Sequence, residues 1–316
     1  MSRGSWALLS LGLVLLCTGG ETTALPCSFE PLDSLPSGRS DFGSAVLGDV
    51  LYVFGGRNSS GLLTSVMALD LTTKGRWRHL PDLSDPRSGL SAVPHPSKGL
   101  IYVIGGVDWE GNVLATVDLY FPGNHSWARG VDLPTGRQYF GAALVGESLY
   151  VFGGWNAQVG TLSSLDVFNT RTQLWTTGPK MLEPAAAFAT GSDGAHVYCF
   201  GGYDYRKPSF LATVQALDVA TAQWKLLPPM PTPRANLAAA RTGDQIHVMG
   251  GQNGTVLSVI ESIDLKTNRW LRFPASLNPP REFFSALSSS SSLLVAGGQN
   301  GPFLSSVQSI DVLLCP

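Results

Sequence analysis

Five arginines stand at a matching position along this chain of 316 residues, shortly before a pair of glycines. Four precede the glycine pair by 16 residues and the fifth by 18: Arg39, Arg137, Arg234 and Arg281, and then Arg87. A guanidinium group presents a rigid fork of N–H donors that fits carboxylate, sulfate or phosphate oxygens. If these side chains gather at one place, they form a focused positive site for an acidic ligand. The alternative is that each guanidinium bonds loop carbonyls and neighbouring acids.

Aromatic side chains form a second group of candidates, because they follow the glycine pairs directly. They lie beside charged residues at four positions: Trp109, Trp155, Tyr203 and Tyr205. Exposed rings flanked by charge are typical of a surface that contacts a protein or a sugar. The alternative is that these rings cover the edges of sheets.

Signals of catalysis or metal binding are weak. The five histidines form no ligand cluster, and His247 stands where other stretches carry a tyrosine. Glu183, close to the position where Ala185 replaces an arginine, is the only acid that suggests chemistry in a channel, and a solvated loop residue is its alternative reading. We therefore expect no metal and no cofactor, and a binding protein rather than an enzyme.

The elements that position these residues are set by the glycine pairs, which recur every 47 to 50 residues. The pairs are Gly55-Gly56, Gly105-Gly106, Gly153-Gly154, Gly201-Gly202, Gly250-Gly251 and Gly297-Gly298. Each ends a short apolar run such as Leu-Tyr-Val-Phe, which indicates a buried strand. In four repeats a second strand then ends in Asp or Asn, and in five repeats a tryptophan follows the first glycine by 20 to 23 residues. Each repeat is therefore expected to be a four-stranded antiparallel meander.

This order of strand, Gly-Gly, second strand, turn acid and tryptophan resembles the kelch repeat, over roughly residues 27–316. The resemblance implies an all-β fold, a six-bladed kelch β-propeller with four antiparallel strands in each blade. In some kelch propellers that act as substrate adaptors, arginines at this position bind acidic peptides. In such a meander the connections before the first strand and after the second emerge on one face, so we expect the arginines and the aromatic residues to share that face.

The last repeat is incomplete, because no tryptophan follows Gly297-Gly298. Phe29 precedes Arg39 by ten residues, the spacing at which a tryptophan precedes the next repeat, so the N-terminal segment is expected to supply the missing outer strand. The repeats are then expected near 39–83, 87–133, 137–182, 185–230, 234–277 and 281–316, the last completed by 27–35.

The cysteines bear on this closure. Alignment with the first repeat places Cys315 and Cys27 on opposite sides of one tight strand turn, which predicts a disulfide that clamps the ring. Two free thiols at frayed termini are the alternative. Cys199 lies inside an apolar run and is expected to be a buried thiol.

An exported protein is expected. Residues 1–24 have the layout of a secretory signal peptide, with cleavage after Gly20 or Ala24, which leaves the propeller at 25–316. A retained signal anchor is the alternative. Three glycosylation sequons fit a secreted glycoprotein: Asn58, Asn124 and Asn253, all expected to be exposed. The net charge of -2 argues against a nucleic-acid partner.

Three functions remain. The first is a secreted binding module that recognises a protein or an acidic glycan through the arginines and aromatic residues. The second is a sugar mutarotase or epimerase, similar to the kelch-type sialic acid mutarotases, which requires a positioned acid and base. The third is a structural component of an extracellular matrix.

Overall fold

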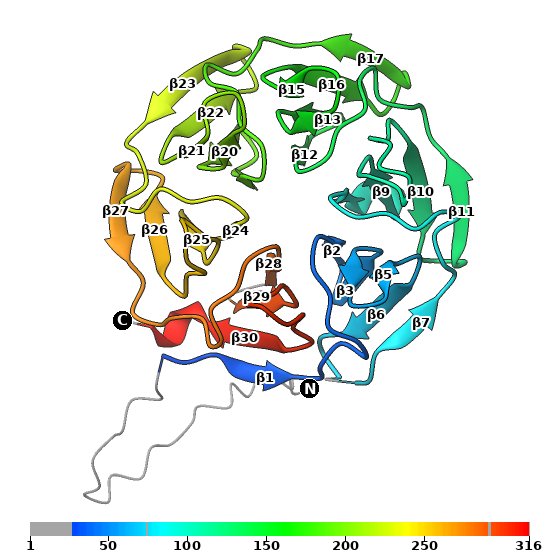
Figure 1. Ribbon diagram of the computed structural model, residues 1–316, viewed down its shortest axis with the longest axis horizontal. Helices are drawn as coiled ribbons and strands as arrows, with labels where there is room; N and C mark the ends of the chain where they lie inside the picture. The colour runs from blue at the N-terminus through cyan, green and yellow to red at the C-terminus, as the bar shows by residue number, and fades with distance from the viewer. Residues whose placement is uncertain (1–26, 74, 290–291, 316) are drawn as a thin grey trace, which may run out of the picture.

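The chain forms a six-bladed β-propeller whose blades surround a central channel (Figure 1). This computed structural model describes residues 27–73, 75–289 and 292–315. The expected signal peptide, residues 1–24, lies outside the described residues. Within the described residues, no helix has the length and apolar character needed to span a membrane.

Each blade is a four-stranded antiparallel sheet, as the repeats predict. The first blade contains β2 (Gly43–Leu47), β3 (Val50–Phe54), β6 (Val66–Asp70) and β7 (Arg78–Leu80). The second contains β8 (Ser91–His95), β9 (Leu100–Ile104), β10 (Val117–Phe121) and β11 (Ser126–Arg129). The third contains β12 (Gly141–Val145), β13 (Ser148–Phe152), β16 (Leu165–Asn169) and β17 (Leu174–Thr177).

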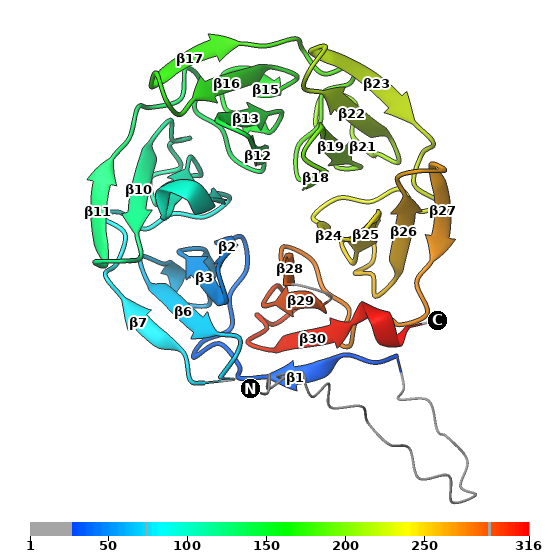
Figure 2. The same cartoon turned by 180° about the vertical axis from the view of Figure 1, so that it is seen from behind.

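The other three blades repeat this order around the ring (Figure 2). The fourth contains β18 (Ala189–Ser192), β19 (His196–Phe200), β22 (Val214–Asp218) and β23 (Gln223–Leu227). The fifth contains β24 (Ala238–Thr242), β25 (Gln245–Met249), β26 (Ile260–Asp264) and β27 (Arg269–Arg272). The sixth contains β28 (Ser285–Ser289), β29 (Ser292–Ala296), β30 (Val307–Asp311) and β1 (Glu30–Leu32).

Short elements decorate the blades. Two-stranded ribbons follow three of the glycine pairs: β4 (Arg57–Asn58) with β5 (Gly61–Leu62), β14 (Trp155–Asn156) with β15 (Gly160–Thr161), and β20 (Tyr203–Asp204) with β21 (Ser209–Phe210). The described residues also form two 3₁₀ turns, η1 (Pro96–Lys98) and η2 (Val312–Leu314). We call the side of the ring that carries the three ribbons the loop face.

The glycine pairs are needed because neighbouring blades approach them closely. Gly153 and Gly154 both have positive φ, and a Cβ atom on Gly153 would lie 2.7 Å from the ring of Phe188 in the next blade. The Gly154 amide donates to the Ala185 carbonyl, also in the next blade, at 2.8 Å. Only glycine combines this backbone conformation with this clearance.

The tryptophans also join neighbouring blades. The indole of Trp127 donates to the Pro81 carbonyl at 3.0 Å, and its ring packs edge-on against Phe54. Equivalent indole bonds to the preceding blade, or for the first blade to the N-terminal segment, are made by Trp77, Trp175, Trp224 and Trp270. The repeated tryptophan thus fixes each outer strand against the neighbouring chain segment.

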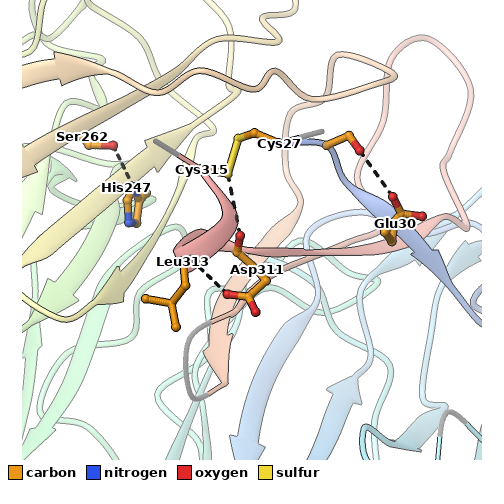
Figure 3. Close-up of a disulfide and its surroundings, with 8 residues drawn as sticks. Cys27, Glu30, His247, Ser262, Asp311, Leu313 and Cys315 are labelled. Carbon is orange, nitrogen blue, oxygen red and sulfur yellow. Dashed lines mark hydrogen bonds between the residues drawn. A yellow bond between two sulfur atoms is a disulfide. The ribbon is translucent and has the colours of Figure 1, made fainter. Parts of the chain in front are cut away.

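Both ends of the chain build the last blade, as expected. β1 pairs with β30 in the register Glu30↔Ser309 to Leu32↔Val307. A disulfide joins Cys27 to Cys315 across 288 residues of sequence (Figure 3). Cys199 is a buried free thiol. Strand pairing and one covalent bond therefore both contribute to closing the ring.

Candidate functional site

The five arginine side chains do not gather into one positive site. All five side chains are buried, and none of them lines either of the two cavities along the channel. Each of Arg39, Arg137, Arg234 and Arg281 donates to the carbonyl of the glycine 16 residues later, at 3.0–3.2 Å. The expectation of one focused positive site is corrected, because the guanidinium groups point into their own blades.

Acidic partners inside the blades neutralise three of these charges. Arg87 pairs with Asp118, Arg137 with Asp166, and Arg234 with Glu261. The other two arginines have neutral partners: Arg281 donates to Gln308 and Ser306, and Arg39 contacts the sulfur of Met67. Burial lowers the pKa of Arg39 and Arg281 to about 10. The guanidinium groups therefore brace the glycine loops, which was the alternative interpretation of the sequence.

The fourth blade lacks both the arginine and its acidic partner. Ala185 replaces the arginine, and the position that carries an acid in three other blades holds Gln215. The amide of this glutamine binds both backbone groups of Glu183, at 3.0 and 2.9 Å. The Glu183 carboxylate accepts a hydrogen bond from Thr213 at 2.6 Å. Glu183 is thus part of the loop that fills the missing arginine position.

A ring of six residues encircles the channel at the loop face, two positions after each arginine or its replacement. They all have positive φ, between 51° and 65°: Asp41, Gly89, Tyr139, Ala187, Asn236 and Phe283. Each amide donates to the carbonyl of the equivalent residue in the preceding blade, at 2.8–3.1 Å, and the Asp41 bond to Phe283 closes the circle. The backbone of this ring joins all six blades, while its side chains are free to differ.

These side chains build a site that we call the channel mouth: Asp41, Arg57, Tyr139, Asn236, Glu282 and Phe283. A cavity of about 150 Å³ is lined by four of these residues together with the apolar ring beneath them. The rings of Tyr139 and Phe283 come from opposite blades, and their centroids lie 5.8 Å apart. Bulky residues rarely adopt positive φ, so both rings are held there at a conformational cost.

Two carboxylates belong to the channel mouth. The Asp41 side chain is buried; its Oδ2 accepts from Ser40 at 2.7 Å and lies 3.0 Å from Nε of Arg57. Its Oδ1 has no hydrogen-bond partner among the described residues. Glu282 is half-buried and accepts from the side-chain amides of Asn236, at 2.9 Å, and Gln299, at 3.2 Å.

The environment shifts the titration of these groups. Burial raises the pKa of Asp41, against the lowering effects of Ser40 and Arg57. Burial and the charge of Asp41 raise the pKa of Tyr139, although no hydrogen bond of normal geometry joins the two. Burial also raises the pKa of Tyr205, with smaller contributions from Tyr203 and Asp41, which places Tyr205 near the mouth.

The four aromatic candidates share the loop face with the channel mouth. Trp109 is 74% exposed and Tyr205 is 49% exposed, whereas Trp155 and Tyr203 are half-buried. Tyr203 packs edge-on against Tyr205 and Phe210, and these three rings line a cavity of about 290 Å³. Asn236 also lines this cavity, so it runs beside the channel mouth.

The remaining candidates occupy separate positions. Asn124 and Asn253 are exposed in loops, whereas Asn58 is half-buried in β4, contrary to the expected full exposure. His247 is buried near the disulfide and contacts Ser262 at 2.7 Å and Thr242 at 2.6 Å (Figure 3). Burial lowers its pKa to about 4. Among the described residues, no three His, Cys, Asp or Glu side chains are grouped as metal ligands.

Sequence reasoning missed Asp41, Tyr139, Asn236, Glu282 and Phe283. A signal was present, because four of them stand two residues after an arginine of the series, where the repeats differ most in residue type. Glu282 directly follows such an arginine. Only the closed ring, however, brings the first and sixth blades together and so places Asp41 beside Phe283.

Comparisons with known proteins agree with the repeat pattern. The KLHDC2/KLHL20/DRC7 kelch-repeats domain matches residues 128–298, and the kelch motif matches residues 38–84 and 87–134. Beta-scruin of Limulus polyphemus is 29% identical over 40% of this chain, and Kelch-like protein 40 of Xenopus laevis is 30% identical over 37%. These matches span only 15% and 20% of the two relatives.

A solved structure has the same fold. The structure of YjhT superposes with a TM-score of 0.75 at 21% identity, over 88% of this chain and 96% of its own. The first family model alone covers more than half of the chain, and the two kelch-motif matches coincide with the first two blades. This chain therefore belongs to the kelch-repeat family of β-propellers.

Proposed function

We propose that this protein is a secreted binding module that recognises a protein partner through its loop face. A kelch propeller domain is typically a protein-binding module. The observation that carries the proposal is the 74% exposure of Trp109, a side chain whose burial at an interface contributes strongly to affinity. The signal-peptide pattern and the disulfide support export, since disulfides persist in oxidising compartments.

The loop that presents Trp109 is held in one conformation. Oδ1 of Asp108 accepts from the amides of Glu110 and Asn112, both at 2.9 Å, and its Oδ2 accepts from the Asn112 side chain at 3.0 Å. A turn whose backbone is held in this way loses little conformational entropy when a partner buries Trp109. Trp109 is thus suited to act as an anchor residue.

An acidic glycan is less well supported than a protein. The expected anion site depended on five accessible guanidinium groups, and these are buried and bonded within the blades. The aromatic residues, by contrast, remain available on the loop face. A protein partner is therefore favoured over an acidic glycan.

Site-specific photo-cross-linking tests the proposal. A photoreactive side chain replaces Trp109 in one sample and Leu174 in the other, an apolar residue of β17 that is 64% exposed. The loop-face probe is expected to capture a partner from the medium of expressing cells that the β17 probe does not. W109A should then weaken that complex at least tenfold, whereas L174A should leave it unchanged. Identical capture from both positions, or an unaffected W109A complex, would refute the proposal.

The mutarotase alternative is favoured by one observation, the two carboxyl groups at the channel mouth. A mutarotase needs an acid and a base, and burial raises the pKa of Asp41, while Arg57 beside it is 42% exposed. Faster interconversion of sialic acid anomers, measured by NMR and lost in D41N, would support this function. An interconversion rate equal to that of buffer would exclude it for that sugar.

A further inference from the structure

The charge of the channel mouth is opposite to that of an anion site. The five arginines that surround it are buried and face away from the mouth, and three of them are paired with acids inside the blades. Asp41 and Glu282 remain at the mouth, and Arg57 is the only cation among its six residues. With both carboxyl groups ionised, these three groups sum to one negative charge. An acidic ligand is therefore disfavoured here, and a cationic group is favoured.

Asp41 makes this charge unusual. Its side chain is fully buried and its Oδ1 has no hydrogen-bond partner among the described residues, although buried carboxylates normally have both oxygens satisfied. Such an oxygen raises the free energy of the unliganded site. A cation held at the mouth would stabilise the charge on this oxygen. The unsatisfied Oδ1, on a carboxylate whose Oδ2 is already paired with Arg57, points to a ligand that carries positive charge.

The aromatic residues favour the same ligand. Tyr139 and Phe283 bring two rings to the cavity, and Tyr205 lies close enough for the charge of Asp41 to act on it. Ring faces attract ammonium and guanidinium groups through their quadrupoles, most strongly where water is excluded. Aromatic rings combined with carboxylates are a common composition of a site for cationic groups.

We propose that the channel mouth binds the ammonium or guanidinium group of a lysine or arginine side chain presented by the protein partner. This inference rests on the proposed function, because the partner that buries Trp109 delivers the side chain. The cation contacts the rings of Tyr139 and Phe283, which line the cavity. Glu282 is half-buried beside them, 2.9 Å from the side-chain amide of Asn236, and attracts the cation. Asp41 acts from beneath them. The cavity of about 150 Å³ equals the volume of about five water molecules, which leaves room for the end of a lysine side chain.

The first experiment uses a free cation as the probe. Nα-acetyl-lysine methylamide is titrated into the mature protein by NMR, and the norleucine analogue, which lacks the ammonium group, serves as the ligand control. The lysine probe is expected to bind with a Kd in the millimolar range, and to bind more weakly as salt is raised. Equal binding of both probes, or no binding of either, would overturn the inference.

Charge-removing variants locate the site. E282Q and D41N keep the size of each side chain and should each weaken binding of the lysine probe by about tenfold. E110Q removes an exposed acid from the same face and should leave binding unchanged. Thermal melting of each variant confirms that the ring is folded. If D41N unfolds the protein, E282Q alone decides, and unchanged binding in E282Q contradicts the inference.

The captured partner separates this inference from the proposed function. If W109A weakens the complex and E282Q also weakens it, both hold. If W109A weakens it while E282Q and D41N do not, the loop face binds the partner and the cation site is refuted. If the free lysine probe binds at the mouth but W109A leaves the partner complex intact, the mouth is a site for free cationic molecules, and both the proposed function and the delivery of the cation by the partner are wrong.

Discussion

Removing the disulfide is expected to weaken the closure of the ring. Cys27 and Cys315 are 288 residues apart, and a chain-entropy model gives a stabilisation of about 5.7 kcal/mol for a loop of that length. Native disulfides typically contribute about 2–5 kcal/mol, so we expect C27S to lose an amount in that range. The pairing of β1 with β30, over three residue pairs, and the backbone bonds between the first and sixth blades remain without the disulfide.

Thermal melting measures this loss. Unfolding of about 290 residues carries an entropy that converts each kcal/mol into about 1.6 °C, so the melting temperature of C27S should fall by about 3–8 °C. A reducing agent should lower the parent protein to the same value and leave C27S unchanged. This control isolates the bond, because the other described cysteine, Cys199, is a buried free thiol. If the melting temperature of C27S equals that of the parent, the clamp contributes nothing and the reasoning fails.

Three further substitutions test the interior of the blades. Burial lowers the pKa of His247 to about 4 from 6.5, so its contribution to stability is full above pH 6.5 and falls as pH decreases toward 4. Urea unfolding should show a loss of about 2 kcal/mol between pH 7 and pH 5, and this loss should be absent in H247Y. R137M leaves the buried carboxylate of Asp166 without its partner and should lower the free energy of unfolding by about 3–5 kcal/mol. R39M removes a guanidinium that has no acid partner and should lower it by clearly less. Equal losses in the two variants would show that the ion pair is not the cause. G153A should destabilise the protein by more than G146A. Both glycines have φ near +60°, but only Gly153 has atoms within 3 Å of the position of an added Cβ. Similar melting temperatures of the two variants would contradict this steric argument.

The fold could be predicted from the sequence because its signals repeat. The spacing of glycine pairs and tryptophans reports contacts within one blade and with its neighbour, and these recur around the ring. The closing strand was found in the same way, since Phe29 occupies a tryptophan position. Its bounds differ slightly: the strand is Glu30–Leu32, because only these residues pair with β30.

The direction of the arginine side chains could not be derived from that pattern. The sequence correctly placed them just before the innermost strands, but side chains there can point toward the channel or into the blade. The acids in β10, β16 and β26 determine the direction of three of the side chains, because each acid pairs with the arginine that stands 27 to 31 residues before it. Their link to the arginines is visible in the sequence once the blade is known, as the change from an acid to Gln215 beside Ala185 illustrates.

The channel mouth shows why function is encoded where the repeats differ. The arginine and glycine positions are occupied by nearly the same residue in every blade, because they satisfy backbone groups that all six blades share. The position two residues after the arginine uses only its backbone for the ring of hydrogen bonds, so its side chain is free to vary. Gly89 meets the positive φ of this position without strain, whereas Tyr139 and Phe283 adopt it at a cost of order 1 kcal/mol or more each. The side chains of Tyr139 and Phe283, together with the unsatisfied Oδ1 of Asp41, destabilise the free protein. A ligand that offsets this cost best explains why the three stand together at the centre of an otherwise regular propeller.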